Sequence, residues 1–377
     1  MIPNQRHRFD IPSDITFLNA AAYTPLMKSV YEAGQAGLER KYHSWALKPA
    51  GVVEEAETCR GLFANLIGAT ADDIAIVPST AYGIATAAIN LPLGSGRNVI
   101  VLEDQFPSNV FSWQQLAEDN SAKLVTVARP DDWNWTSAVL EQIDTETDIV
   151  TLPNNHWMEG SRLDLVSIGK RCREVGAAFV IDATQSVGAM ALDVGELQPD
   201  FLICSAYKWL LCPYTLGFLY ASPERQQGRP LELHRQNHRP DESAAGQLDY
   251  SVDFTSGARR FDMGERNNFI NMPMAVAALT QLNEWGPAAI QETLTPLTDR
   301  VAEEAMARGW RVPGKDKRIG HYIGITPPNP LAEDMISRLE GVNFYLTRRG
   351  SGLRIAPHLF NDINDIEQLF AALDNIT

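Results

Sequence analysis

The chain has few cysteines, no long apolar run and no cluster of basic residues. Its 4 cysteines are too few for a disulfide framework, and none forms the C-x-x-C spacing of zinc or redox sites. No run approaches the roughly 18 apolar residues that a transmembrane helix needs, and the first residues lack the apolar core of a signal peptide. We therefore expect a soluble, cytoplasmic protein that holds no metal and does not contact a membrane.

Acidic residues outnumber basic ones. The chain has 47 Asp and Glu against 32 Lys and Arg, a formal net charge of −15 at pH 7. No basic run is longer than a pair such as Arg259-Arg260 or Arg348-Arg349. Because binding to a polyanion needs clustered cations, the composition excludes a nucleic-acid partner. A small anion remains compatible with this charge, since a few backbone amides can hold one.

Short β-rich segments alternate with helical ones up to about residue 260. The β-rich segments are 74–78, 98–102, 123–127, 149–152, 179–181 and 201–204, and helical spacing occurs at 55–67 and 165–176. This alternation is typical of an α/β fold with a mainly parallel sheet flanked by helices.

Helical patterns dominate after residue 260. They cover 273–285, 296–308 and 364–373, with short strands near 319–325 and 352–356. We predict a large domain from residue 16 to 260. A smaller α+β domain would combine residues 1–15 with residues 261–377.

Ligands of open parallel sheets bind beyond the carboxyl ends of the strands, so polar residues at those positions are candidates. Ser79 and Thr80 follow the segment 74–78, where their hydroxyls and the free amides of a helix start would suit a phosphate. Taken alone, ordinary helix capping is the better explanation of these two residues. Asp182 ends the segment 179–181, and a carboxylate there must be paired or hydrogen-bonded. Its alternative role is to cap the following turn.

Lys208 lies in an apolar setting, between Tyr207 and Trp209. Lysine is rare in such runs unless it is paired or reactive, and burial frees the neutral amine for Schiff-base formation. A lysine that extends to solvent is the alternative. Lys208, Asp182 and the turn at Ser79 together match the needs of pyridoxal 5'-phosphate: an amine for the imine, a carboxylate for the pyridine nitrogen and an anion site.

The chain resembles the fold-type I pyridoxal-phosphate enzymes, in particular the class V aminotransferase group, which includes cysteine desulfurases, kynureninases and isopenicillin-N-epimerase-like proteins. The motifs that carry the resemblance extend over nearly the whole chain. They are FLNAAAYTPL, DQFPSNVFSW, IDATQSVGA, SAYKWL, RRFDMGERNNF and GLRIAPHLFN. The resemblance implies the PLP-transferase fold, in which a large domain binds the cofactor and a smaller C-terminal domain completes the site.

The resemblance also implies a role for each matching residue. Lys208 would form the Schiff base, and Asp182 would partner the pyridine nitrogen. Gln185 would contact the phenolic oxygen of the cofactor, and Phe106 would stack on its ring. Arg354 would bind the substrate α-carboxylate, a task that suits a guanidinium fork. Besides Ser79, the predicted phosphate contacts are Thr80, Ser205 and Tyr207.

Four departures from the group narrow the expected activity. Phe106 stands where desulfurases have a histidine, and the segment GVNFYLTRRGSGLR before the predicted arginine contains no cysteine. We therefore do not expect persulfide-forming desulfurase activity. Gln185 stands where kynureninases have a histidine. Trp157 occupies a region where several members place an asparagine, so that contact is missing or His156 supplies it.

We expect an enzyme that acts at Cα of an amino acid, with transamination as its reaction. A C–S β-lyase and an amino-acid epimerase are the alternatives within the group, and a degenerate scaffold protein is the alternative that is not an enzyme. The Ser205–Lys208 match to S-x-x-K of penicillin-binding enzymes lacks the accompanying S-D-N and K-T-G elements. The resemblance further implies a homodimer, with Thr255 and Glu265 near the shared site. Tyr23, Trp157 and Arg259 are candidates for the substrate pocket.

Overall fold

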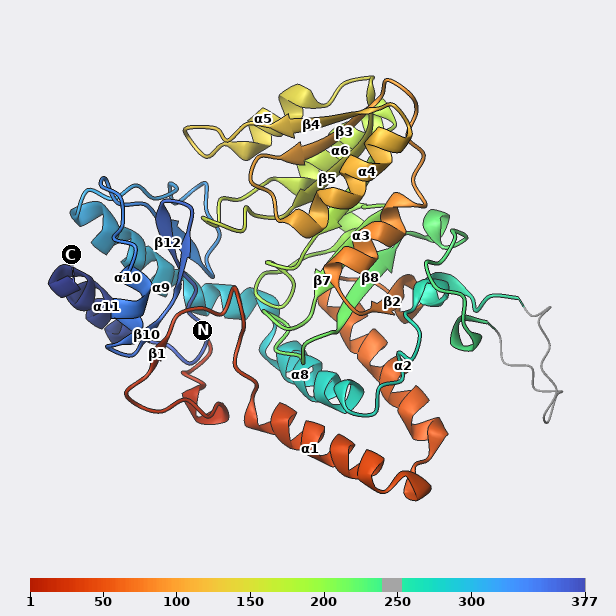
Figure 1. Ribbon diagram of the computed structural model, residues 1–377, viewed down its shortest axis with the longest axis horizontal. Helices are drawn as coiled ribbons and strands as arrows, with labels where there is room; N and C mark the ends of the chain where they lie inside the picture. The colour runs from red at the N-terminus through yellow and green to blue at the C-terminus, as the bar shows by residue number, and fades with distance from the viewer. Residues whose placement is uncertain (239–252, 377) are drawn as a thin grey trace.

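A seven-stranded sheet forms the centre of the computed structural model, which describes residues 1–238 and 253–376 (Figure 1). In spatial order its strands are β2 (Ile74–Val77), β8 (Gly217–Ala221), β7 (Phe201–Ser205), β6 (Ala178–Asp182), β5 (Thr147–Pro153), β3 (Asn98–Leu102) and β4 (Lys123–Val127). All neighbours pair in parallel except β8, which is antiparallel to both β2 and β7. The predicted α/β fold with a mainly parallel sheet is confirmed.

Helices cover both faces of this sheet because its strands are apolar on both sides. Alternate residues of one strand enter different cores: Ile76 packs with one cluster and Val77 with the other. The helices α2 (Pro49–Leu66), α5 (Trp135–Gln142) and α6 (Leu165–Val175) contribute to the first cluster. The helices α3 (Thr80–Ala88) and α4 (Phe111–Asp119) contribute to the second. A short helix, α7 (Val194–Leu197), precedes β7.

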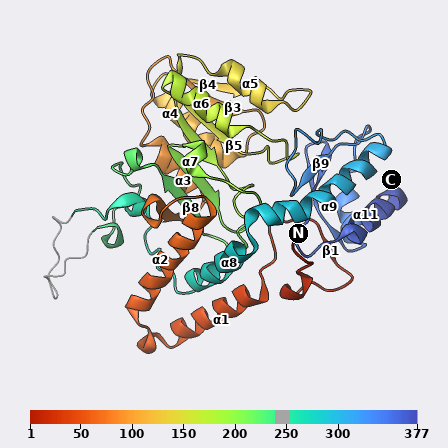
Figure 2. The ribbon, with the colours of Figure 1, turned by 180° about the vertical axis from the view of Figure 1, so that it is seen from behind.

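A second group of elements lies beside the sheet (Figure 2). It contains a three-stranded antiparallel sheet in the order β11 (Thr347–Arg349), β12 (Gly352–Ile355) and β9 (Ile323–Ile325). Around it lie α9 (Pro287–Ala307), α10 (Met335–Glu340) and α11 (Ile363–Ile376). The N-terminal segment joins this group, since β1 (Thr16–Phe17) pairs in parallel with β10 (Phe344–Tyr345). Two further helices, α1 (Lys28–Tyr42) and α8 (Asn271–Trp285), pack on each other, and α8 also packs on α2.

Among the elements that differ from the sequence prediction are β8 and α9. The strand β8 is absent from the predicted set, although it lies between β2 and β7. The helix predicted to begin at Pro296 begins at Pro287, so Pro296 lies inside α9 and does not start it. The division of the chain into domains at residue 260 stays a prediction. Across residues 1–238 and 253–376 the structure holds no helix with the length and apolarity that a membrane crossing requires.

Candidate active site

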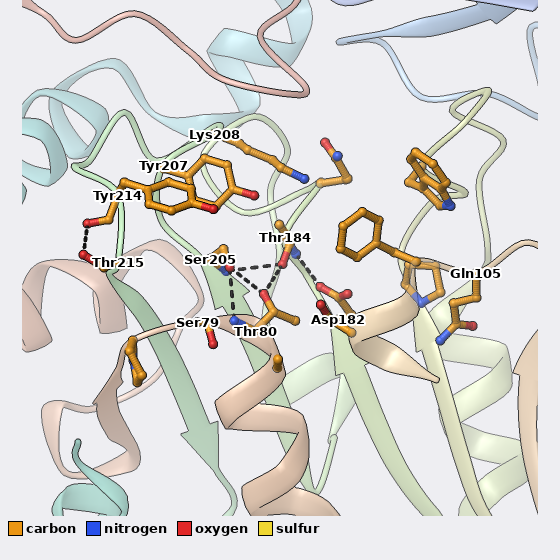
Figure 3. Close-up of a pocket in the computed structure, with 17 residues that line it drawn as sticks. Ser79, Thr80, Gln105, Asp182, Thr184, Ser205, Tyr207, Lys208, Tyr214 and Thr215 are labelled. Atoms are coloured by element: carbon orange, nitrogen blue, oxygen red, sulfur yellow. Dashed lines mark hydrogen bonds between the residues drawn. The ribbon is translucent and has the colours of Figure 1, made fainter. Parts of the chain in front are cut away.

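A cavity of about 290 Å³ opens beyond the carboxyl ends of β2, β6 and β7 (Figure 3). Eight of the nine predicted site residues line it: Ser79, Thr80, Phe106, Asp182, Gln185, Ser205, Tyr207 and Lys208. The ninth, Arg354, lies on β12 and is not among the lining residues, but its charge acts on Lys208. Residues from distant parts of the sequence therefore meet at the sheet edge where a ligand is expected.

Three hydroxyl groups lie together at the start of α3. Thr80 Oγ1 is 2.7 Å from Ser205 Oγ and 2.8 Å from Thr184 Oγ1, and the Thr80 amide donates to Ser205 Oγ over 3.1 Å. Ser79 Oγ accepts a hydrogen bond from the Tyr82 amide over 3.2 Å and so caps α3. Ser79 also lines the cavity. Hydroxyl groups beside a helix N-terminus form a suitable anion site. Thr184 is a contributor that the sequence prediction lacks.

Asp182 is the last residue of β6 and only 8% of its surface is exposed. The Thr184 amide donates to Asp182 Oδ1 over 3.0 Å. Burial raises the pKa of this carboxyl, while the hydrogen bonds from Thr184 and the charge of Lys208 act in the opposite direction. A cationic N–H placed at this carboxylate would offset the cost of its desolvation.

Lys208 follows β7 and is 6% exposed. Burial, followed by the positive charges of Arg354 and Arg349, lowers the pKa of its amine to about 8, although Asp182 opposes the shift. Its Nζ lies 5.3 Å from the ring centre of Phe106 and 5.6 Å from that of Tyr207. The neutral, nucleophilic form of the amine is therefore far more populated near pH 7 than in an ordinary lysine.

The backbone next to Lys208 packs closely against Gly188. Gly188 has φ of +95°, and a Cβ there would clash with the carbonyl oxygen of Trp209. Only glycine permits both this conformation and this contact. Trp209 Nε1 in turn donates to Gln185 Oε1 over 2.9 Å, and Gln185 Nε2 donates to the Ala21 carbonyl over 2.9 Å. The amide orientation of Gln185 is thereby defined, and its second N–H is left for a ligand.

Arg354 is the most deeply buried cation near the cavity, with 1% of its surface exposed. Its Nη1 donates to the Trp157 carbonyl over 2.8 Å, whereas Nε and Nη2 have no partner among the described residues. Burial and the charge of Arg349 lower its pKa to about 10. Two unsatisfied N–H groups on one guanidinium are costly, and a carboxylate would satisfy both.

Three further candidates, His156, Arg259 and Tyr23, do not line the cavity. His156 is fully buried: its Nδ1 is 2.7 Å from Glu159 Oε2, its Nε2 is 3.1 Å from the Glu103 carbonyl, and its ring stacks on Trp135. It does not line the cavity, so the alternative that His156 replaces the missing asparagine contact is wrong. Trp157 does line the cavity, with its ring edge-on to Phe106 at 5.4 Å.

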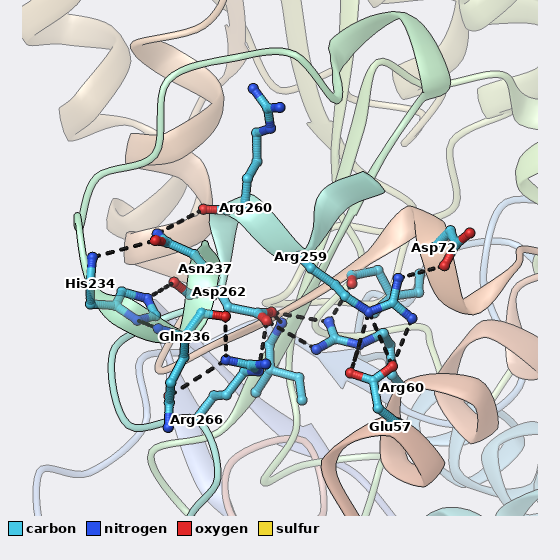
Figure 4. Close-up of polar contacts among 12 residues, drawn as sticks. Glu57, Arg60, Asp72, His234, Gln236, Asn237, Arg259, Arg260, Asp262 and Arg266 are labelled. Atoms are coloured by element: carbon cyan, nitrogen blue, oxygen red, sulfur yellow. Dashed lines mark hydrogen bonds and ion pairs between the residues drawn. The ribbon is translucent and has the colours of Figure 1, made fainter. Parts of the chain in front are cut away.

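Arg259 does not line the cavity either. It belongs to an ion-pair cluster (Figure 4). It pairs with Glu57 and Asp72, and the same cluster contains a fully buried pair between Arg60 and Asp262. The prediction of Arg259 as a pocket residue is therefore wrong, since its charge is already neutralised. Tyr23 is 62% exposed and contacts Tyr207 with ring centres 5.6 Å apart.

The chain belongs to the aminotransferase class-V family, whose model matches residues 16–317. Among its relatives is the uncharacterized aminotransferase YcbU of Bacillus subtilis, 27% identical over 330 residues, which are 86% of this chain and 84% of YcbU. The isopenicillin N epimerase of Streptomyces clavuligerus is 22% identical over 99% of this chain and 97% of its own length.

Solved structures with the same fold include the cysteine desulfurase of Thermococcus onnurineus, with a TM-score of 0.84 at 19% identity, covering 98% of this chain and 96% of that one. The cystine C–S lyase C-DES superposes with a TM-score of 0.86 at 18% identity, covering 96% and 97%. The predicted family and fold are thus confirmed.

The predicted cofactor, pyridoxal 5'-phosphate, is confirmed with the family, because class V aminotransferases use it. The cavity fits the group on its own evidence. It offers a buried amine of lowered pKa, a desolvated carboxylate and a hydroxyl cluster at a helix start. The particular role of each residue stays a prediction.

Proposed function

We propose that this protein is a pyridoxal-phosphate enzyme that transaminates an amino acid, with Lys208 as its catalytic residue. The observation that carries the proposal is that Lys208 and Asp182 line one cavity, while the unsatisfied Arg354 lies near enough for its charge to act on Lys208. When bound, pyridoxal phosphate supplies an electron sink for the pair released at Cα. The remaining work is done by side chains of the chain.

Each side chain has a defined task in this proposal. Lys208 holds the cofactor and, when the substrate displaces it, moves a proton at the substrate Cα, for which a pKa of about 8 is well suited. Asp182 holds the proton on the pyridine nitrogen. The Thr80–Thr184–Ser205 hydroxyls bind the phosphate at the start of α3. Arg354 orients the substrate through its α-carboxylate.

The cysteines favour transamination over persulfide formation. All four, Cys59, Cys172, Cys204 and Cys212, are buried and free. Burial raises the thiol pKa in each case, to about 12 for Cys59 and Cys172. A nucleophilic sulfur must be accessible and readily ionised, and these thiols are neither. A sulfur-accepting cysteine of the desulfurase kind is therefore not available in this chain.

The test begins with the absorption spectrum. Purified protein with pyridoxal phosphate is expected to show the visible band of the lysine-linked cofactor, and Lys208→Ala is expected to abolish it. Amino acids are then screened for keto-acid formation, for release of ammonia or sulfide, and for deuterium exchange at Cα. Keto acid formed without free ammonia supports transamination, because the amino group then stays on the cofactor. Ammonia or sulfide would replace it with β-elimination, exchange with inversion would indicate epimerisation, and a colourless wild type would refute the proposal.

We also infer that the enzyme is a homodimer. Large apolar side chains lie exposed along α1 and the turn after it: Tyr31, Leu38, Tyr42 and Trp45 are each more than half exposed. A contiguous apolar face of this kind is typical of a protein interface. Sedimentation of the wild type as a dimer and of Leu38→Asp as a monomer would support the inference, and a monomeric wild type would refute it. The proximity of Thr255 and Glu265 to the shared site stays a prediction.

A further inference from the structure

A second arginine lies beside Arg354 on the same face of a β-hairpin. In the register of β11 and β12, Thr347 is opposite Arg354 and Arg349 is opposite Gly352. Residues directly opposite each other share a face, and so do residues two apart along a strand. Arg349 and Arg354 are therefore diagonal neighbours on one face. Gly352, opposite Arg349, has no side chain, and the place that a Cβ would take is filled by the Ile325 carbonyl and the Thr326 hydroxyl.

Both guanidinium groups converge on one wall of the cavity. The Cζ atom of Arg349 is 5.2 Å from the ring centre of Trp157, and that of Arg354 is 6.0 Å from the same ring. Trp157 is itself a lining residue of the cavity that contains Lys208. The positive charges of both arginines also act on the Lys208 amine.

Neither guanidinium is neutralised within the described chain. Arg349 pairs with no carboxylate there, its Nε is buried without a partner, and its Nη1 donates to the Arg348 carbonyl over 3.3 Å. Arg129 differs from both because Glu159 and Asp104 pair with it. In a chain of net charge −15, two adjacent unpaired arginines form an unusual concentration of positive charge.

Two like charges at close range destabilise the free protein, and a ligand that carries negative charge removes that cost. One α-carboxylate accepts two parallel hydrogen bonds and so satisfies one guanidinium fork, that of Arg354. The fork of Arg349 remains, and it requires a second anionic group on the same ligand. We propose that Arg349 binds an anionic group at the far end of the substrate, so that the enzyme acts on amino acids with a second carboxylate.

The proposal rests on the proposed function, because it names the substrate class of the same site. A second carboxylate occurs on an acidic side chain and also on the far half of a disulfide-linked amino acid such as cystine. The two sources share the chemistry that Arg349 recognises. L-Glutamate, L-aspartate and L-cystine therefore form separate arms of the test, and each acidic amino acid is matched with its amide.

The experiment compares kcat/KM for L-glutamate with that for L-glutamine, and for L-aspartate with that for L-asparagine. We expect the wild type to prefer the acid of at least one pair by about tenfold or more, the size of a charge-assisted hydrogen bond. Arg349→Gln is expected to abolish that preference, and Arg349→Lys is expected to restore part of it. Arg348→Gln changes an exposed neighbour on the opposite face of the hairpin and is expected to leave the preference as it is.

A measurement without turnover separates binding from chemistry. Titration calorimetry of the holoenzyme with succinate and with butyrate is expected to show tighter binding of the dicarboxylate in the wild type and equal binding in Arg349→Gln. If Arg349→Gln weakens acids and amides equally, Arg349 shares the α-carboxylate and the proposal is overturned. If only L-cystine shows the Arg349 effect, the disulfide-linked source is the correct one. Absence of the visible band would refute the proposed function instead, so the two failures are distinguishable.

Discussion

Lys208 should capture pyridoxal phosphate at a lower pH than an ordinary lysine can. Burial and the neighbouring arginines lower its pKa from 10.5 to about 8. At pH 7 about one amine in eleven is then neutral, against about one in three thousand for an unperturbed lysine, a gain of roughly 300-fold in the reactive form. Below pH 8 both Lys208 and an ordinary lysine are mostly protonated, and Lys208 keeps its full advantage in neutral amine. The advantage shrinks as the pH rises above 8, and it is lost once the pH exceeds 10.5, where an ordinary lysine is neutral as well.

The assay is stopped-flow absorbance of cofactor-free protein mixed with pyridoxal phosphate between pH 6 and pH 10.5. We expect the rate to rise about tenfold per pH unit up to pH 8 and to level off above it. Arg354→Gln removes a positive charge that acts on the amine and should move the midpoint upward. Arg300→Gln, on α9, changes an arginine that is not among the groups acting on Lys208 and serves as the control. A rate that still rises tenfold per unit near pH 10 would refute this account.

Three further predictions concern the site and its support. Asp182→Asn should lower kcat by about a hundredfold or more and leave the melting temperature nearly unchanged, because it removes a charge and little volume; equal turnover would contradict its role. Asp262→Asn leaves the Arg60 charge buried with a neutral partner and should lower the free energy of unfolding by about 3–5 kcal/mol in urea titrations. Gly188→Ala should lower the melting temperature and the cofactor occupancy together, since the new Cβ meets the Trp209 carbonyl; unaffected occupancy would show that this contact does not hold Lys208 in place.

The fold was predictable where the sequence pattern is local. Continuous β-branched runs such as Asn98–Leu102 and Lys123–Val127 coincide with β3 and β4. The strand β8 could not be found in this way, because its residues Gly217–Ala221 continue an apolar stretch that begins before Lys208. The start of α9 could not be predicted from Pro296, because this proline lies inside the helix. There, packing of the helix against the core outweighs the missing hydrogen bond.

The site was predictable where its residues follow strand ends. This reasoning found Asp182 and Lys208. It missed Thr184, although Thr184 lies only two residues beyond Asp182 and its hydroxyl completes the cluster. Arg349 was not, because in sequence it is one half of an ordinary basic pair. Only the register of the β11–β12 hairpin decides that Arg349, and not Arg348, shares a face with Arg354.

The pairing of the N-terminal segment with the last part of the chain has a consequence for the order of folding. Gln5 donates to the Leu359 carbonyl, and Leu18 and Ala20 exchange backbone hydrogen bonds with Ala356. Because synthesis proceeds from the N-terminus, a ribosome makes the first of these partners long before the second. The segment that is made first therefore docks last, after the strands of the large sheet have already been able to pair. Until then the apolar Leu18, which is fully buried in the folded protein, is exposed to solvent.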